Sequence, residues 1–332
     1  MSATFEQLWN ELLGWVPKLE PLAAQKVVNR AWIDIQDSRL WSFAVMEGSI
    51  TIPADISSGA ATVTQDSATV VMDATATAAL NAVGAGLLER QFRVGLSSAV
   101  YNIQAWDGAG NLTLERAFGE ISASSQVYHI YQCYYPPPAT DFLRWISIVN
   151  VDQKYPLECG LMKCDLDRVD PGRGFTGQPY RVATYRTNPA HDSGSTFTGE
   201  VMFELWPHPV THQTLQCLYQ RKSAEFSGPT AILPDVITTE TLMDRAKYKA
   251  YEWAMANQGK HPDLKGIPWL DLIKAAKLSY EEGIQQNIRN DEETFQQLRA
   301  GSYLYSQLKG LTMNSSYMIN HAPIYTWPYV YG

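Results

Sequence analysis

Residue types that could support catalysis stand together at one place, where His191, Asp192 and Ser193 are consecutive. A hydrolytic triad uses these three types, but it brings them from separate elements of a fold so that each side chain orients the next. Three neighbours in a polar, glycine-containing stretch are typical of a loop. We therefore expect no nucleophilic catalysis at this segment.

A second candidate is the glycine-rich stretch from Asp170 to Gly174, which reads DPGRG. A phosphate-binding loop ends in Lys followed by Ser or Thr and leads directly into a helix. This stretch lacks the Lys–Ser/Thr ending, and no helical pattern follows it. It predicts a turn.

Possible metal ligands are acids and histidines. Asp291, Glu292 and Glu293 are consecutive, so they point in different directions around a helix, and acids are favoured in a first helical turn in any case. We interpret them as the solvated start of a helix. His208 and His212 are four residues apart, but they flank Pro209 in an expected turn and cannot share a helical face.

The four cysteines have neither the paired spacing of a zinc site nor the pattern of a disulfide framework; they are Cys133, Cys159, Cys164 and Cys217. We expect free, buried thiols. Taken together, the sequence predicts no catalytic residues, no cofactor and no metal, and the protein is expected not to be an enzyme.

The C-terminal segment from Gly310 to Gly332 contains no Asp, Glu, Lys or Arg. Burying one large apolar side chain is worth roughly 1.5–3 kcal/mol, so this segment either folds back on its own core or docks on another subunit. Pro323 and Pro328 interrupt it, which favours an extended arm that docks on a partner. Its candidate anchors are Tyr317, Ile324, Tyr325, Trp327, Tyr329 and Tyr331.

The composition of the 332 residues also points to contacts with partners. Charged residues make up 18%, where about 25% is usual, and interface cores are depleted in charge and enriched in Tyr and Trp. A large aromatic core would explain the same composition. The net charge of −8 argues against a grip on nucleic acid, which requires a basic surface. The N-terminus lacks the features of a signal peptide, and no apolar stretch is long enough to span a bilayer.

The elements that must position these residues are expected to form an α+β fold. Residues 1–47 read as two helices, with a capping box at Thr4 and Gln7 and a helix start at Pro21. Residues 48–135 break into short Val- and Thr-rich runs and predict an inserted antiparallel β-barrel or sandwich.

Residues 136–309 are expected to continue the helical core. Alternating runs at 201–206 and 215–219 predict a β-hairpin around Pro207 and Pro209. Helices follow after Pro234 and Pro268, and Asn290 is expected to cap a last helix over 291–298. The predicted architecture is a helical bundle from both ends of the chain, a hairpin region, an inserted β module and the arm at 310–332.

Several stretches resemble the head–tail adaptor (connector, or neck) proteins of tailed bacteriophages. They are LWPHP, TLQCLYQRKSAEFSG and ILPDVITTETLMDRAKYKAYEWA, together with the early helix ending in DSRLWSF and the phrase YYPPPATDFLRWISI. The runs ATVTQDSATVV, RQFRVG, YNIQAWD and LTLERAF are similar to a β module often inserted in such virion proteins. The resemblance covers most of residues 20–300.

This resemblance implies a structural virion protein at the head–tail junction, assembled in the host cytoplasm. Adaptors form a homo-oligomeric ring, commonly of twelve copies, below the portal protein, and downstream tail or neck proteins bind below them. Their C-terminal arm reaches into the portal, and residues 310–332 match that arm. DNA passes through the lumen during packaging and ejection without sequence-specific binding, and no membrane is involved.

Two alternatives remain. Stoppers and tail terminators are also rings of the phage neck and grade into the same family. A glycan-binding or glycan-cleaving protein, with the β module as its carbohydrate face, belongs to another class; cleavage would require a pair of carboxylates, and the sequence offers no convincing pair.

Overall fold

The computed structural model describes residues 3–95, 99–185 and 201–301. The fold is mixed α+β, as the sequence predicts. Its contacts divide the chain into two compact units, one made of Met1–Ala44 with Ser223–Gly332 and the other of Val45–Lys222. Residues 136–222, which the sequence grouped with the helices, therefore lie in one unit with residues 45–135.

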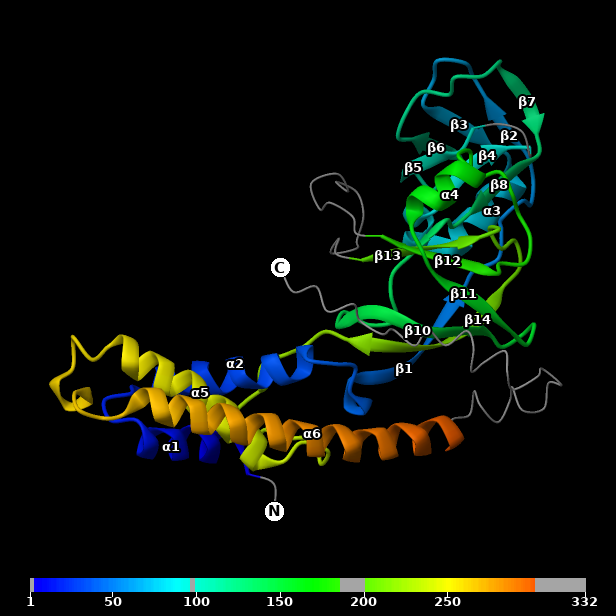
Figure 1. The fold of residues 1–332 in the computed structure, drawn as a ribbon. Coiled ribbons are helices and arrows are strands. Elements are labelled where there is room, and N and C mark those ends of the chain that lie inside the picture. Colours follow the sequence, from blue (N-terminus) through cyan, green and yellow to red (C-terminus); the bar gives the residue numbers. More distant parts are fainter. Residues whose placement is uncertain (1–2, 96–98, 186–200, 302–332) are drawn as a thin grey trace. The chain divides into compact units, whose positions relative to one another are not determined.

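The first unit is helical. Its helices are α1 (Phe5–Trp15), α2 (Pro21–Asp37), α5 (Thr239–Ala256) and α6 (Trp269–Gly301), with short 3-10 turns η1 (Ser42–Ala44) and η3 (Pro262–Leu264). The expected start signals are confirmed. Thr4 and Gln7 form a capping box, and Pro21 is the first residue of α2. Among these helices, α5 lies side by side with the first part of the longer α6 (Figure 1).

Small residues allow this close packing. Ala246, Ala250 and Ala254 of α5 are fully buried in one hydrophobic core with Leu8 and Leu12 of α1. At Gly283 of α6, an added Cβ would lie 2.5 Å from the hydroxyl oxygen of Thr241. At this position the packing of α6 on α5 leaves no room for a side chain larger than that of glycine.

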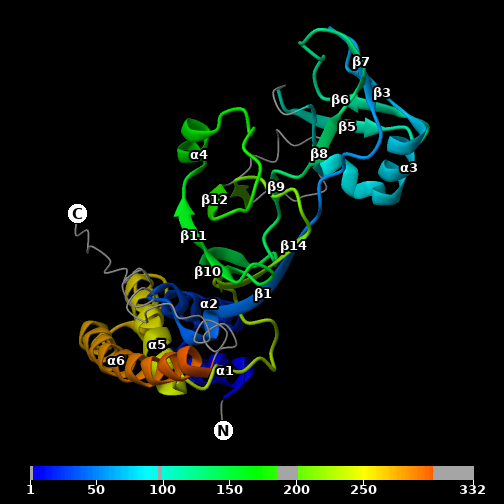
Figure 2. The ribbon, with the colours of Figure 1, turned by 90° about the vertical axis from the view of Figure 1, so that its right-hand side faces the viewer.

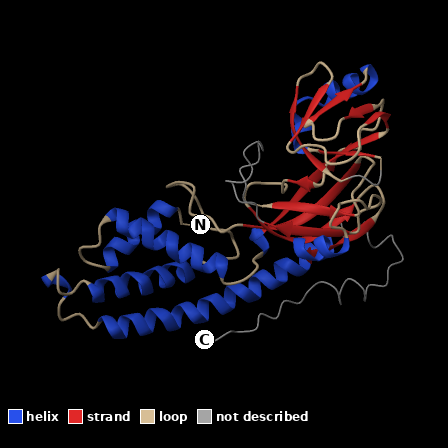
Figure 3. Ribbon diagram, turned by 90° about the horizontal axis from the view of Figure 1, so that it is seen from above, coloured by secondary structure: helices blue, strands red, loops and turns tan. Residues whose placement is uncertain are grey.

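Helix α6 is continuous through Asn290 (Figure 3). The expected separate helix beginning at Asp291 is therefore wrong. No proline interrupts the segment, so the apparent capping pair at Asn290 and Glu293 simply lies on the surface of a longer helix.

The second unit contains two seven-stranded sheets. The first has the order β1-β14-β10-β11-β12-β13-β9 and is antiparallel except where β11 pairs with β12. Its strands are β1 (Val45–Ile52), β9 (Tyr134–Tyr135), β10 (Phe142–Asn150), β11 (Tyr155–Leu161), β12 (Arg181–Tyr185), β13 (Met202–Trp206) and β14 (Gln213–Arg221). Between β11 and β12 the chain forms α4 (Lys163–Val169) and the segment that holds the polar cluster described below (Figure 2).

The expected hairpin of β13 with β14 is wrong. Both strands form, but β13 pairs with β12 and β9, whereas β14 lies between β1 and β10. Residues 207–212 connect β13 to a strand that is not its neighbour in the sheet, so they do not form a hairpin turn. The backbone of this connection is paired elsewhere, because His208 exchanges hydrogen bonds with Phe175 and Gly177.

The second sheet is wholly antiparallel, with the order β7-β2-β3-β6-β5-β4-β8, and curls into a nearly closed barrel. Its strands are β2 (Ala61–Val63), β3 (Thr69–Met72), β4 (Gln91–Val94), β5 (Tyr101–Trp106), β6 (Asn111–Leu114), β7 (Ala123–Gln126) and β8 (Tyr128–Tyr131). It also contains α3 (Ala74–Val83) and η2 (Gly84–Glu89), which the sequence did not predict; Asp73 caps α3. Residues 48–52, which the sequence placed at the start of this module, lie in β1 of the other sheet.

Candidate functional site

The anchor residues that the sequence singles out lie outside the described residues; they are Tyr317, Ile324, Tyr325, Trp327, Tyr329 and Tyr331. The same holds for His191, Asp192 and Ser193. The structure therefore tests neither the arm nor the expectation that the second segment is a loop.

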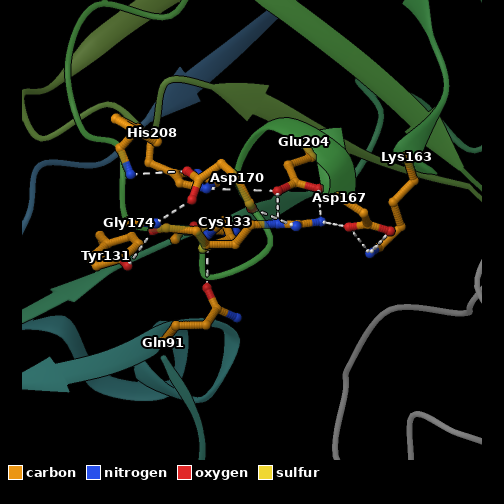
Figure 4. A network of polar contacts seen from close by, with 12 residues as sticks. Gln91, Tyr131, Cys133, Lys163, Asp167, Asp170, Gly174, Glu204 and His208 are labelled. Carbon is orange, nitrogen blue, oxygen red and sulfur yellow. Dashed lines mark hydrogen bonds and ion pairs between the residues drawn. The ribbon is translucent and has the colours of Figure 1, made fainter. Parts of the chain in front are cut away.

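A buried polar cluster in the second unit is the main concentration of charge that the structure brings together (Figure 4). It consists of Asp167, Asp170, Arg173, Glu204 and His208. Two come from α4 and its end, one from the following turn, and two from β13 and the residues after it. These positions are far apart in sequence, so only the fold assembles the cluster.

The turn after α4 directs Arg173 inward. The carboxylate of Asp170 accepts hydrogen bonds from the peptide N–H groups of Gly174 at 2.8 Å and Phe175 at 2.9 Å. Arg173 itself has φ of 50°, in the left-handed region that few residues other than glycine adopt. The stretch DPGRG is therefore a turn, as predicted, and its backbone is fixed by an internal carboxylate.

Arg173 forms a two-armed ion pair with Glu204. Nε lies 2.5 Å from Oε1, and Nη2 donates to Oε2 at 3.1 Å, while both side chains are almost fully buried. Burial raises the pKa of Glu204, and the guanidinium opposes that rise. Such a pair holds its geometry firmly because each charge would be costly to bury alone.

Asp167 extends the cluster toward the surface. It accepts hydrogen bonds from Arg173 and, at 3.0 Å, from Lys163. Partial burial raises the pKa of Asp167, but the hydrogen bonds and positive charges of Arg173 and Lys163 outweigh this effect and hold the pKa below its ordinary value.

His208 is fully buried beside the ion pair. Its Nε2 is 3.7 Å from Glu204 Oε1, and its ring lies 5.7 Å from that of Tyr131. Burial lowers the pKa of His208 to about 4, so the imidazole is neutral at pH 7. Its peptide group bridges Phe175 and Gly177 at 2.9 Å each, which ties the turn to the end of β13.

The cluster also connects the two sheets. Arg93 of β4 donates to the carbonyl of Gly174 at 3.2 Å, and the Tyr131 hydroxyl of β8 donates to the carbonyl of Arg173 at 3.0 Å. Next to them, the peptide N–H of Cys133 donates to Gln91 at 2.8 Å. Burial raises the pKa of the Cys133 thiol well above its usual range, so it is not a thiolate nucleophile.

An open hollow of about 600 Å³ borders the cluster. Its polar lining is already paired: Asn102 donates to Glu115 at 2.6 Å, and Arg116 lies over the ring of Tyr101 at 4.9 Å. Within the described ranges, acids, histidines and cysteines do not gather in threes that could hold a metal ion. The arrangement fits a polar joint between two sheets.

The prediction that Asp291 is exposed to solvent is wrong. It was interpreted as a solvated helix start, but its side chain is fully buried in α6 and accepts hydrogen bonds from the peptide N–H of Ser42 at 3.0 Å and its hydroxyl at 2.5 Å. Arg39 lies 3.8 Å away. Glu292 and Glu293 are exposed, as expected.

The four cysteines are free thiols, as predicted, but only Cys133 and Cys217 are buried; Cys159 is half-buried and Cys164 is exposed, so the expectation of burial is wrong for these two. None of the helices in the described part of the chain combines the length and the apolarity that crossing a membrane requires. In comparisons with known proteins, no family model matches this chain, and no curated protein sequence matches it either.

Proposed function

We propose that this chain is a structural virion protein, a head–tail adaptor whose copies form a ring between the portal and the tail of a phage. The observation that carries the proposal is the charge-free aromatic segment Gly310–Gly332, which comes eight residues after the long helix α6 in the sequence. A segment of this composition gains free energy when a partner covers it.

The helical unit supports the proposal. Helices from the two ends of the chain share one hydrophobic core, and the whole β unit, Val45–Lys222, is inserted between them. A helical core with an inserted β-rich part is the arrangement that the sequence resemblance implies. The polar cluster supports a structural role, because its charges are committed to holding elements together.

The proposed mechanism needs no reaction. Each copy contributes one arm with Tyr325, Trp327 and Tyr329 among its anchors, and a ring of copies, expected to number twelve, engages the portal through many weak contacts at once. The net charge of −8 suits a lumen through which DNA passes without being held.

Deleting Thr312–Gly332 tests this proposal. The truncated chain is expected to keep the circular dichroism spectrum of the full chain but to lose co-sedimentation with the portal protein of its own phage. Electron microscopy of the full chain mixed with that portal should show rings. Two single substitutions in the full-length chain test whether aromatic side chains anchor the arm. Trp327→Ala should weaken binding to the portal, whereas Ser315→Ala, the matched control, should not.

Two results would contradict the proposal. One is loss of folding on truncation, which would place the segment in the protein's own core. The other is a full chain that neither binds portal nor forms rings. A ring that binds another neck protein but not the portal would favour a stopper or a tail terminator.

A further inference from the structure

The exposed face of three adjacent strands carries a row of side chains that the polar cluster does not use. Glu158 of β11 lies opposite Arg181 of β12, and Arg181 lies opposite Trp206 of β13. Tyr180 and Phe175 contact Trp206 with their rings at 69° to it, at centroid distances of 5.2 and 6.3 Å. We name these five residues the aromatic platform.

Backbone hydrogen bonds and the side chain of Arg181 connect the residues of the platform. The peptide N–H of Tyr180 donates to the carbonyl of Trp206 at 3.0 Å, and the carbonyl of Tyr180 accepts from Glu158 at 2.8 Å. Arg181 lies over the rings of both Tyr180 and Trp206, at 5.3 and 5.7 Å. Its Nε donates to the Glu158 carboxylate at 3.1 Å. These contacts hold the backbone of Tyr180 and the guanidinium of Arg181 in place beside the rings.

Two of its rings are nevertheless left to solvent. Phe175 is 59% exposed and Tyr180 is 44% exposed. Within the described residues, only Trp15 is another comparably exposed aromatic side chain, and it lies in the helical unit. Exposed aromatic residues that gather in one place indicate a binding surface more than single ones do.

The charges beside the rings select the kind of ligand. Arg181 and Glu158 form an exposed pair with no net charge, so a charged ligand would be opposed by one of them. A hydroxyl group both donates and accepts hydrogen bonds, and can therefore satisfy the guanidinium and the carboxylate together. The platform fits a neutral ligand with several hydroxyls on one side and an apolar face for the rings on the other.

The platform is small compared with the surface that a protein partner usually covers. A stable protein interface uses roughly 20–30 residues on each side, whereas the platform has five side chains. We propose that the aromatic platform binds a neutral carbohydrate. One or two pyranose units lie against Phe175 and Tyr180, and the hydroxyls of the sugar form hydrogen bonds with Arg181 and Glu158. This site lies outside the β module to which the sequence assigned the alternative carbohydrate face, and it does not depend on the adaptor proposal.

A glycan array probed with the full chain tests the proposal, followed by calorimetric titration with the tightest neutral oligosaccharide on the array. We expect binding to neutral glycans. Phe175→Ala and Tyr180→Ala should each weaken it by roughly tenfold, the change that loss of about 1.4 kcal/mol produces. Tyr180→Phe keeps the ring and should retain most of the binding.

Trp15→Ala is the matched control, because it removes an exposed aromatic ring elsewhere and should leave glycan binding unchanged. Circular dichroism of each variant checks that the fold is intact. Three outcomes would overturn the proposal: no neutral glycan bound by the full chain, binding that survives both alanine variants, or binding restricted to charged glycans.

Discussion

At the scale of single residues, the ion pair of Arg173 with Glu204 has the clearest energetic consequence. Glu204 has no exposed surface, so its charge depends on the guanidinium beside it. Replacing one partner of a buried pair leaves an uncompensated charge, whereas an exposed pair contributes little.

Arg173→Met is therefore expected to lower the free energy of unfolding by about 3–5 kcal/mol. Urea denaturation measures this directly. Lys277→Met is the matched control, since its pair with Glu281 is exposed on both sides and should contribute at most about 1 kcal/mol. Equal losses in both variants would show that the buried pair has no special role.

The burial of His208 makes the free energy of unfolding depend on pH. Its pKa is lowered by burial from 6.5 to about 4, so between these values the unfolded chain takes up a proton that the folded chain does not. The contribution to stability is complete above pH 6.5 and is lost as the pH falls toward 4, by about 3 kcal/mol. Measured against His208→Gln, the free energy of unfolding of the natural chain should fall more steeply in this window. Parallel curves would contradict the assignment.

At the scale of elements, the contact of α5 with α6 depends on Gly283. Alanine normally favours a helix over glycine by about 1 kcal/mol. At Gly283, however, the new Cβ meets the hydroxyl oxygen of Thr241 at 2.5 Å, while at Gly14 in α1 it meets nothing within 4 Å. The same substitution should therefore lower stability at Gly283 but not at Gly14.

Gly283→Ala is expected to destabilise the protein by roughly 1–3 kcal/mol, and Gly14→Ala to leave stability unchanged or slightly increased. Thermal or urea unfolding distinguishes them. Adding Thr241→Ala removes the hydroxyl and should reduce the cost of Gly283→Ala. If the cost stays the same with Thr241 truncated, the close contact is not its cause.

The strands show how far local pattern reaches. Alternation along residues 201–206 and 215–219 predicted two strands, and both are present as β13 and β14. Proximity in sequence then suggested that they pair, which is wrong, because β14 is taken up between β1 and β10. Burial alternates along most of β14, whereas in β13 both faces are covered and Glu204 is buried with its apolar neighbours. The partners of β14 come from residues about 70 to 170 positions away.

At the scale of the whole molecule, the hydrophobic cores follow the two units. The helical unit has one core of its own, and the β unit has two. Within the β unit, Val45 lies opposite Gln220, so the strands that enter and leave it are neighbours. A unit whose ends meet and whose cores are complete should fold without the rest of the chain.

Residues 45–222 expressed alone are expected to give a β-rich circular dichroism spectrum and a cooperative thermal transition. The reason is that, among the described residues, those of both β cores all lie within this range. An unfolded or aggregated product would show that the helical unit supplies essential stability.

The sequence by itself determined the α+β class, the helix starts at Thr4 and Pro21, the free thiols and the turn at Asp170–Gly174. These follow from spacing, caps and turn residues within a few positions, where local geometry decides. Only the tertiary structure decided that His208 and Asp291 are buried and that Arg173 meets Glu204. Whether a polar side chain is buried and paired depends on which distant segments pack against it. The types of the neighbouring residues in the sequence do not report such a long-range contact.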